Sequence, residues 1–219
     1  MSEVVLVRPG CTDFDDQHRI QGTLDLPLNE KGEQELDEIA VQLKEHSLEV
    51  IFSAPCESAR LTAQSIGSLL KIPVKEVKEL RNLNQGLWQG LQVEEVKRKY
   101  PKAYKQWLES PELVCPPEGE MVEDAIERIR KVLKKPIKKQ TSFAVVAPDP
   151  LATLVGCVIR GGTSGLSFVS QSDSGKPCQV ELLEKDGEPV PKQTMERKTN
   201  GKASQTNKEA RKDCGGEEQ

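Results

Sequence analysis

The chain has 219 residues, of which 36% are hydrophobic and 30% charged, and its formal net charge at pH 7 is −4. That length fits one domain of ordinary size followed by a tail. The small negative charge gives no reason to expect a nucleic-acid partner, because phosphate backbones are bound by clustered Lys and Arg. No apolar stretch approaches the roughly 20 residues of a membrane span, and no signal-peptide pattern opens the chain. We therefore expect a cytoplasmic protein with no membrane partner.

The cysteines and histidines do not form a recognised metal-binding pattern. Six cysteines are scattered without a Cys-x-x-Cys pair, and His18 and His46 are the only two histidines. Structural zinc sites combine Cys and His at short, regular spacing. We expect reduced thiols, no metal, no cofactor, and surface or capping roles for both histidines.

Short runs of β-branched and other apolar residues predict the strands. They cover residues 4–7, 49–53, 74–80, 143–147 and 179–183. The continuous apolar run at residues 4–7 is typical of a strand buried on both faces of a parallel sheet.

Helical periodicity fills the intervals between these strands. Helices are expected from about Asn29, over residues 60–70 and over residues 151–159, whereas the stretch before Asn29 is expected to be a loop. A stripe over residues 93–107 should be divided by Pro101, and another over residues 125–133 should end at Pro136. Strands alternating with helices predict an α/β fold with a mostly parallel sheet.

Residues 185–219 have a different composition. They contain 8 basic and 7 acidic residues, and Val190 and Met195 are their only sizeable apolar ones. Such a segment cannot bury enough surface to offset the entropy of ordering. We expect a domain over residues 1–184 and a disordered polar tail over residues 185–219.

Polar motifs follow the predicted elements in a fixed order. They are Arg8-Pro9-Gly10, Arg19-Ile20-Gln21-Gly22, Asp25-Leu26-Pro27-Leu28, Ser53-Ala54-Pro55, Ala59-Arg60-Leu61-Thr62-Ala63, Leu80-Arg81-Asn82-Leu83 and Pro116-Pro117-Glu118-Gly119-Glu120. In this order they resemble the histidine phosphatase (phosphoglycerate mutase-like) family, which opens with a strand, Arg-His-Gly and Arg-x-Gln-Gly. The resemblance implies a three-layer α/β fold whose mostly parallel central sheet is flanked by helices.

The resemblance also implies a catalytic pocket, and this sequence departs from it. In the family one histidine attacks phosphorus, two arginines and a second histidine hold the phosphate, and an acid protonates the leaving group. Arg8 is retained, but the other four positions correspond to Pro9 (nucleophile), Ser58 (second arginine), Asn82 (acid) and Pro148 (second histidine). Proline can neither attack nor transfer a proton, and Asn82 can only form hydrogen bonds.

Two further positions bear on the charge of the pocket. Arg60, two positions after Ser58, would point to another side of its helix and is a poor substitute for the missing arginine. Asp15 stands where the family often has asparagine, and it adds negative charge where an anionic substrate would approach. We expect the remodelled pocket to use Arg8, Gly10, Thr12, Arg19, Gln21, Asn82 and Asp149.

Two other residues of nucleophilic type, Cys11 and Asp13, follow the first strand. Cys11 follows the first strand, but it lacks the Cys-x5-Arg spacing with which cysteine phosphatases hold phosphate. Asp13-Phe14-Asp15 resembles the Asp-x-Asp of magnesium-dependent aspartate phosphatases, but its position after the strand and the following Gln17 do not fit. A small loop residue and a solvated acidic loop are the simpler interpretations.

The sequence thus predicts a catalytically inactive pseudophosphatase that binds a small anionic ligand or a protein partner. A phosphomonoesterase or mutase built on unconventional residues, and a structural scaffold subunit, are the alternatives. A homodimer stays open.

Overall fold

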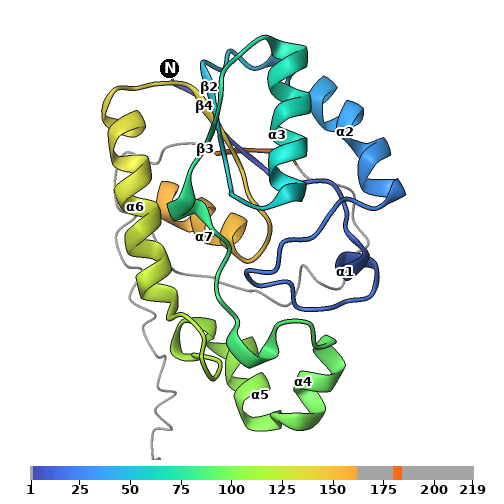
Figure 1. Cartoon of the computed structure of the whole chain (residues 1–219). Coiled ribbons are helices and arrows are strands. Elements are labelled where there is room, and N and C mark those ends of the chain that lie inside the picture. The colour runs from blue at the N-terminus through green and yellow to red at the C-terminus, as the bar shows by residue number, and fades with distance from the viewer. Residues whose placement is uncertain (1, 162–179, 184–219) are drawn as a thin grey trace, which may run out of the picture. The chain divides into compact units, whose positions relative to one another are not determined.

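The fold is taken from a computed structural model, drawn in Figure 1, which describes residues 2–161 and 180–183. All of these residues belong to one compact unit, Met1–Glu188. The predicted tail, residues 185–219, lies outside the described residues, so its disorder stays a prediction. Within the described ranges, no helix has the length and apolar character needed to cross a bilayer.

A mixed sheet forms the centre of this unit. Its strands are β1 (Val4–Val7), β2 (Val50–Ser53), β3 (Val74–Glu76), β4 (Phe143–Val146) and β5 (Val180–Leu183), in the order β3-β2-β4-β1-β5. The first four are parallel, and β5 is antiparallel to β1. Both β1 and β4 are buried along their whole length, which accounts for their uninterrupted apolar sequences. The predicted α/β architecture with a mostly parallel sheet is confirmed.

Helices cover both faces of the sheet (Figure 1). α2 and α3 lie on one face, and α6 and α7 lie on the other. The helices are α1 (Asp13–Asp16), α2 (Glu30–Gln42), α3 (Glu57–Leu70), α4 (Val93–Lys99), α5 (Pro101–Glu109), α6 (Val122–Lys138) and α7 (Leu151–Ile159). Short 3-10 turns add η1 (Leu43–Glu45), η2 (Lys78–Leu80), η3 (Gly86–Trp88) and η4 (Pro111–Leu113).

Several predicted boundaries differ from the structure. The loop expected before Asn29 contains the single turn of α1, and α3 begins at Glu57, one turn earlier than predicted. The third strand ends at Glu76 and is followed by η2. Pro136 does not end its helix, because it lies in the last turn, where the loss of one backbone donor leaves the preceding turns intact. By contrast, Pro101 does divide its stripe, and it occupies the favoured first position of α5.

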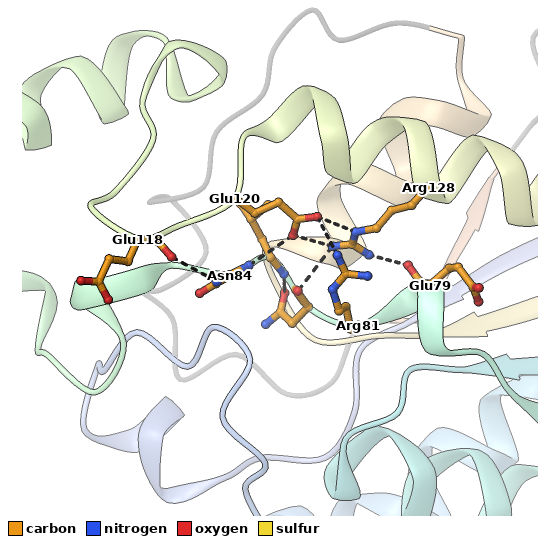
Figure 2. A network of polar contacts seen from close by, with 8 residues as sticks. Glu79, Arg81, Asn84, Glu118, Glu120 and Arg128 are labelled. Carbon is orange, nitrogen blue, oxygen red and sulfur yellow. Dashed lines mark hydrogen bonds and ion pairs between the residues drawn. The ribbon is translucent and has the colours of Figure 1, made fainter.

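A buried ion pair between α6 and the loop just before it belongs to a network that also contacts η2 and the segment after it (Figure 2). Arg128 binds Glu120 through two hydrogen bonds, Nε to Oε1 at 2.8 Å and Nη2 to Oε2 at 3.0 Å, and both side chains are about nine-tenths buried. Arg128 also donates to the backbone carbonyls of Glu79 and Asn82, and Arg81 reaches Glu120 at 3.2 Å. The network therefore fixes the backbone that carries Asn82.

Removing Arg128 should destabilise the domain strongly. Arg128→Ala leaves the Glu120 carboxylate buried without its main partner, which costs about 3–5 kcal/mol in comparable pairs. Arg130→Ala, at an exposed position of the same helix, should change the free energy of unfolding by less than about 0.5 kcal/mol. Urea denaturation measures both, and equal losses would show that the network contributes nothing specific.

Candidate functional site

Three parallel strands end together at one edge of the sheet. Val7 pairs with Val146, and Ser53 also pairs with Val146, so β1, β4 and β2 reach the same level. Arg8 leaves β1 at this edge, and α3 and α7 begin shortly after β2 and β4. Open α/β sheets bind ligands outside the carboxyl ends of their strands. This edge is the candidate site.

An ion pair between Arg8 and Asp149 lies at the centre of this edge. Arg8 Nε donates to Asp149 Oδ2 at 2.6 Å, and the two side chains are 16% and 27% exposed. The other carboxylate oxygen, Oδ1, accepts from the backbone N–H of Thr153 at 3.2 Å and from its hydroxyl at 2.9 Å. Glu181 of β5 lies 3.8 Å from Arg8 Nη1. The Asp149 carboxylate thus bridges the arginine and the first turn of α7.

Asn82 fixes the backbone on which Asp149 is carried. Its Nδ2 donates to the Asp149 carbonyl at 2.9 Å, and its Oδ1 accepts from the N–H groups of Leu83 at 2.9 Å and Leu151 at 3.2 Å. The residue is only 5% exposed. Asn82 therefore holds the loop after β4.

The segment after Arg8 is tied to α3. The Gly10 N–H donates to the Thr62 hydroxyl at 3.1 Å, and that hydroxyl donates to the Ser58 carbonyl at 2.8 Å. A side chain at Gly10 would collide with the Gly32 carbonyl, since an added Cβ would lie 2.5 Å from its oxygen. Ser58 is buried, and it carries no charge that could replace the missing arginine.

Pro9 and Pro148 adjoin the two members of the Arg8–Asp149 pair, whereas Arg60 pairs with a residue of β3. Pro9 is half-buried next to Arg8, and Pro148 is fully buried next to Asp149. Arg60 makes an ion pair with Glu76 of β3, at 3.7 Å. That Arg60 does not replace the second arginine of the family stays a prediction.

Thr12 and Asp15 cap the short helix α1. The backbone N–H and hydroxyl of Thr12 donate to Asp15 Oδ2 at 2.8 and 2.7 Å. Asp15 is an exposed residue, but partial desolvation of its carboxyl raises its pKa; the bonds from Thr12 oppose this, and the negative charges of Asp16 and Asp149 add to it. The carboxyl of Asp15 is therefore weakly coupled to that of Asp149.

Arg19 and Gln21 form contacts within the loop that follows α1 and with the turn at Gly90. Arg19 Nη1 donates to the Gly90 carbonyl at 2.6 Å and its Nε to Gln17 at 2.8 Å, and Gln21 Nε2 donates to the Leu24 carbonyl at 3.3 Å. The structure thus joins Arg8, Asn82 and Asp149 directly. It gives Arg19 and Gln21 roles in holding their loop.

The alternative nucleophiles are engaged elsewhere. The Cys11 thiol donates to Glu35 Oε1 at 3.3 Å, the Cys11 N–H donates to Glu35 Oε2 at 3.0 Å, and both residues are buried. Asp13 is exposed on α1. Residues 2–161 and 180–183 contain no group of three His, Cys, Asp or Glu side chains placed to hold a metal. These ranges therefore offer no set of side chains that could hold the magnesium ion of an aspartate phosphatase.

The sequence did not predict some of the side chains that contact the residues of this site. Thr153 contacts Asp149 and Glu181 contacts Arg8, and neither residue was singled out. Asp25 was part of a quoted motif, but its hydrogen bond from the Glu57 N–H at 2.6 Å was not predicted. One signal was available, because an Asp just before an apolar helix commonly caps it. Asp149 stands in that position before α7.

Comparison with known proteins decides the family. The model of the histidine phosphatase superfamily (branch 1) matches residues 4–155. The chain belongs to this superfamily. Phosphoserine phosphatase 1 of Hydrogenobacter thermophilus is 31% identical over 146 residues, which are 67% of this chain and 69% of that protein. The metal-independent phosphoserine phosphatase of Arabidopsis thaliana is 33% identical over 149 residues, covering 67% and 63%.

Solved structures of other proteins have the same fold. A mycobacterial glucosyl-3-phosphoglycerate phosphatase in complex with VO3 superimposes with a TM-score of 0.69 at 22% identity, covering 83% of this chain and 97% of that one. YhfR of Bacillus stearothermophilus gives a TM-score of 0.69 at 21% identity, covering 85% and 93%. The predicted family and fold are confirmed.

Asp15→Asn should stabilise the protein at neutral pH and lose this advantage in acid. A folded-state pKa above the ordinary value of 3.8 means that the folded state binds the proton more tightly than the unfolded chain. Stability therefore falls as the pH rises from that value through the raised pKa. An amide keeps an acceptor oxygen for Thr12 and has no charge to desolvate.

Thermal unfolding from about pH 3 to 8 measures this difference between variant and wild type. Asp13→Asn removes a charge from the same helix without touching Thr12, so it separates the effect of net charge from that of the Asp15 carboxyl. An advantage of Asp15→Asn that shrinks as the pH rises would contradict the assigned direction.

Proposed function

We propose that this chain is a pseudophosphatase: a member of the histidine phosphatase superfamily that binds a ligand or protein partner and does not hydrolyse phosphate esters. The Arg8–Asp149 ion pair carries the proposal. The one family arginine retained at this edge already has a carboxylate partner at 2.6 Å. A substrate phosphate would have to share the guanidinium with that carboxylate or displace it.

The side chains next to the pair support the same conclusion. Phosphoryl transfer through a phosphohistidine needs a nucleophile, a second histidine and a proton donor. Pro9 and Pro148 offer neither a nucleophile nor a transferable proton, and Asn82 uses its amide to hold the loop after β4. Loss of the nucleophile from such a unit costs on the order of 10⁶ in rate.

The relatives favour a second candidate function. Proteins about one-third identical to this chain are named phosphoserine phosphatases. A phosphomonoesterase that uses unconventional residues is therefore the rival to the proposed binding role. Such an enzyme would still need a cation for the phosphate, and Arg8 is the family residue available for it.

Phosphate release from p-nitrophenyl phosphate, phosphoserine and 3-phosphoglycerate should separate the two. We expect the wild type to match Arg8→Ala and buffer, whereas an active superfamily phosphatase, purified and assayed in parallel, turns over. Wild-type turnover that disappears in Arg8→Ala but persists in Cys11→Ala and Asp13→Ala would sink the pseudophosphatase proposal.

A further inference from the structure

We infer that Asp149 is a specificity-determining residue: its carboxylate occupies the position of a bound oxyanion and keeps phosphate-like anions out of the site. This inference rests on the proposed function, and it concerns which ligands the same site rejects. It also predicts that a single substitution uncovers an anion site.

Three features at this edge would otherwise attract an anion. They are the Arg8 guanidinium and the amino-terminal ends of α7 and α3, where backbone N–H groups point outward. Asp149 is the hydrogen-bond partner of Arg8 and of the start of α7. Its Oδ2 accepts from Arg8, and its Oδ1 accepts from the N–H and hydroxyl of Thr153. Asp25 serves the third, because it accepts from the Glu57 N–H at 2.6 Å. Each source of positive potential therefore has a carboxylate of the chain as its partner.

The Asp149 carboxylate is also held in place from behind. The Asn82 side chain donates to the Asp149 carbonyl and accepts from the Leu151 N–H, so the backbone on both sides of Pro150 is fixed. A carboxylate fixed in this way competes with a free anion at no further cost in entropy, because its ordering has already occurred during folding.

The remaining charges near Arg8 disfavour an anion as well. Glu181 lies 3.8 Å from Arg8 and pairs with Arg160, so both cations have carboxylate partners. Asp15 is an exposed residue of α1 whose pKa is raised by partial desolvation and by the charge of Asp149, so it adds a weaker negative contribution. A phosphate dianion would meet this excess negative charge in a partly desolvated place, where screening is weak.

Isothermal titration calorimetry with inorganic phosphate and orthovanadate tests the inference. Asp149→Asn keeps the shape of the side chain and removes its charge. We expect saturable binding to Asp149→Asn, and wild-type binding that is weaker by on the order of tenfold or more. The double variant Arg8→Gln/Asp149→Asn should lose that binding. Asp37→Asn, at an exposed position of α2, changes net charge equally and should bind like the wild type.

Thermal unfolding of every variant confirms folding before titration, and Asp149→Ser replaces Asp149→Asn if the latter does not fold. Equal phosphate affinity of the wild type and the folded Asp149 variant would overturn the inference, as would binding that survives loss of Arg8. Failure of the proposed function would be recognised by a different result. The same wild-type preparation would release phosphate from the phosphate esters named above. Wild type without turnover but with tight phosphate binding would reject only the inference.

Discussion

The Arg8 guanidinium leaves β1 at the edge where three parallel strands end, and its side chain is only 16% exposed. A charge held this far from water needs a partner, because an unpaired buried ion costs several kcal/mol. Asp149, from the loop after β4, provides that partner. The surrounding structure is arranged around this pair: Asn82 holds the backbone of Asp149, Thr153 holds its second oxygen, and Arg128 holds the carbonyl of Asn82.

The fold does not depend on the residues that its family uses for catalysis. The sheet is stabilised by the fully buried strands β1 and β4 and by the helices on both faces, and these elements lie behind the ligand-binding edge. Exchanges at that edge can therefore remove chemistry while the architecture is kept. Pro148 is buried just after the end of β4. Asn82 uses its side chain for hydrogen bonds within the protein, whereas a catalytic acid at this position would also have to contact the substrate. The relatives include proteins named as phosphatases and mutases, and we propose that in this chain the same edge contributes to stability instead of turnover.

Much of the fold could be predicted from the sequence, because local patterns determine it. Continuous apolar runs identified β1 and β4, and Asn29 was recognised as the start of α2, where its side chain accepts from the Gly32 N–H. Helix α3 was placed one turn late because its capping residue, Cys56, makes no side-chain cap and gives no signal. At the site, motif order placed Arg8, Asn82 and Asp149 in one pocket, but the ion pair between Arg8 and Asp149 could not be predicted. Arg8 and Asp149 are 141 positions apart, and no periodicity links residues at that separation.

The most direct test of this account is a crystal structure at neutral pH, from crystals soaked in phosphate or orthovanadate. The account predicts that the Arg8 Nε–Asp149 Oδ2 hydrogen bond persists and that no oxyanion density appears against the guanidinium. A bound oxyanion on Arg8, with Asp149 displaced and its contacts to Thr153 broken, would contradict it.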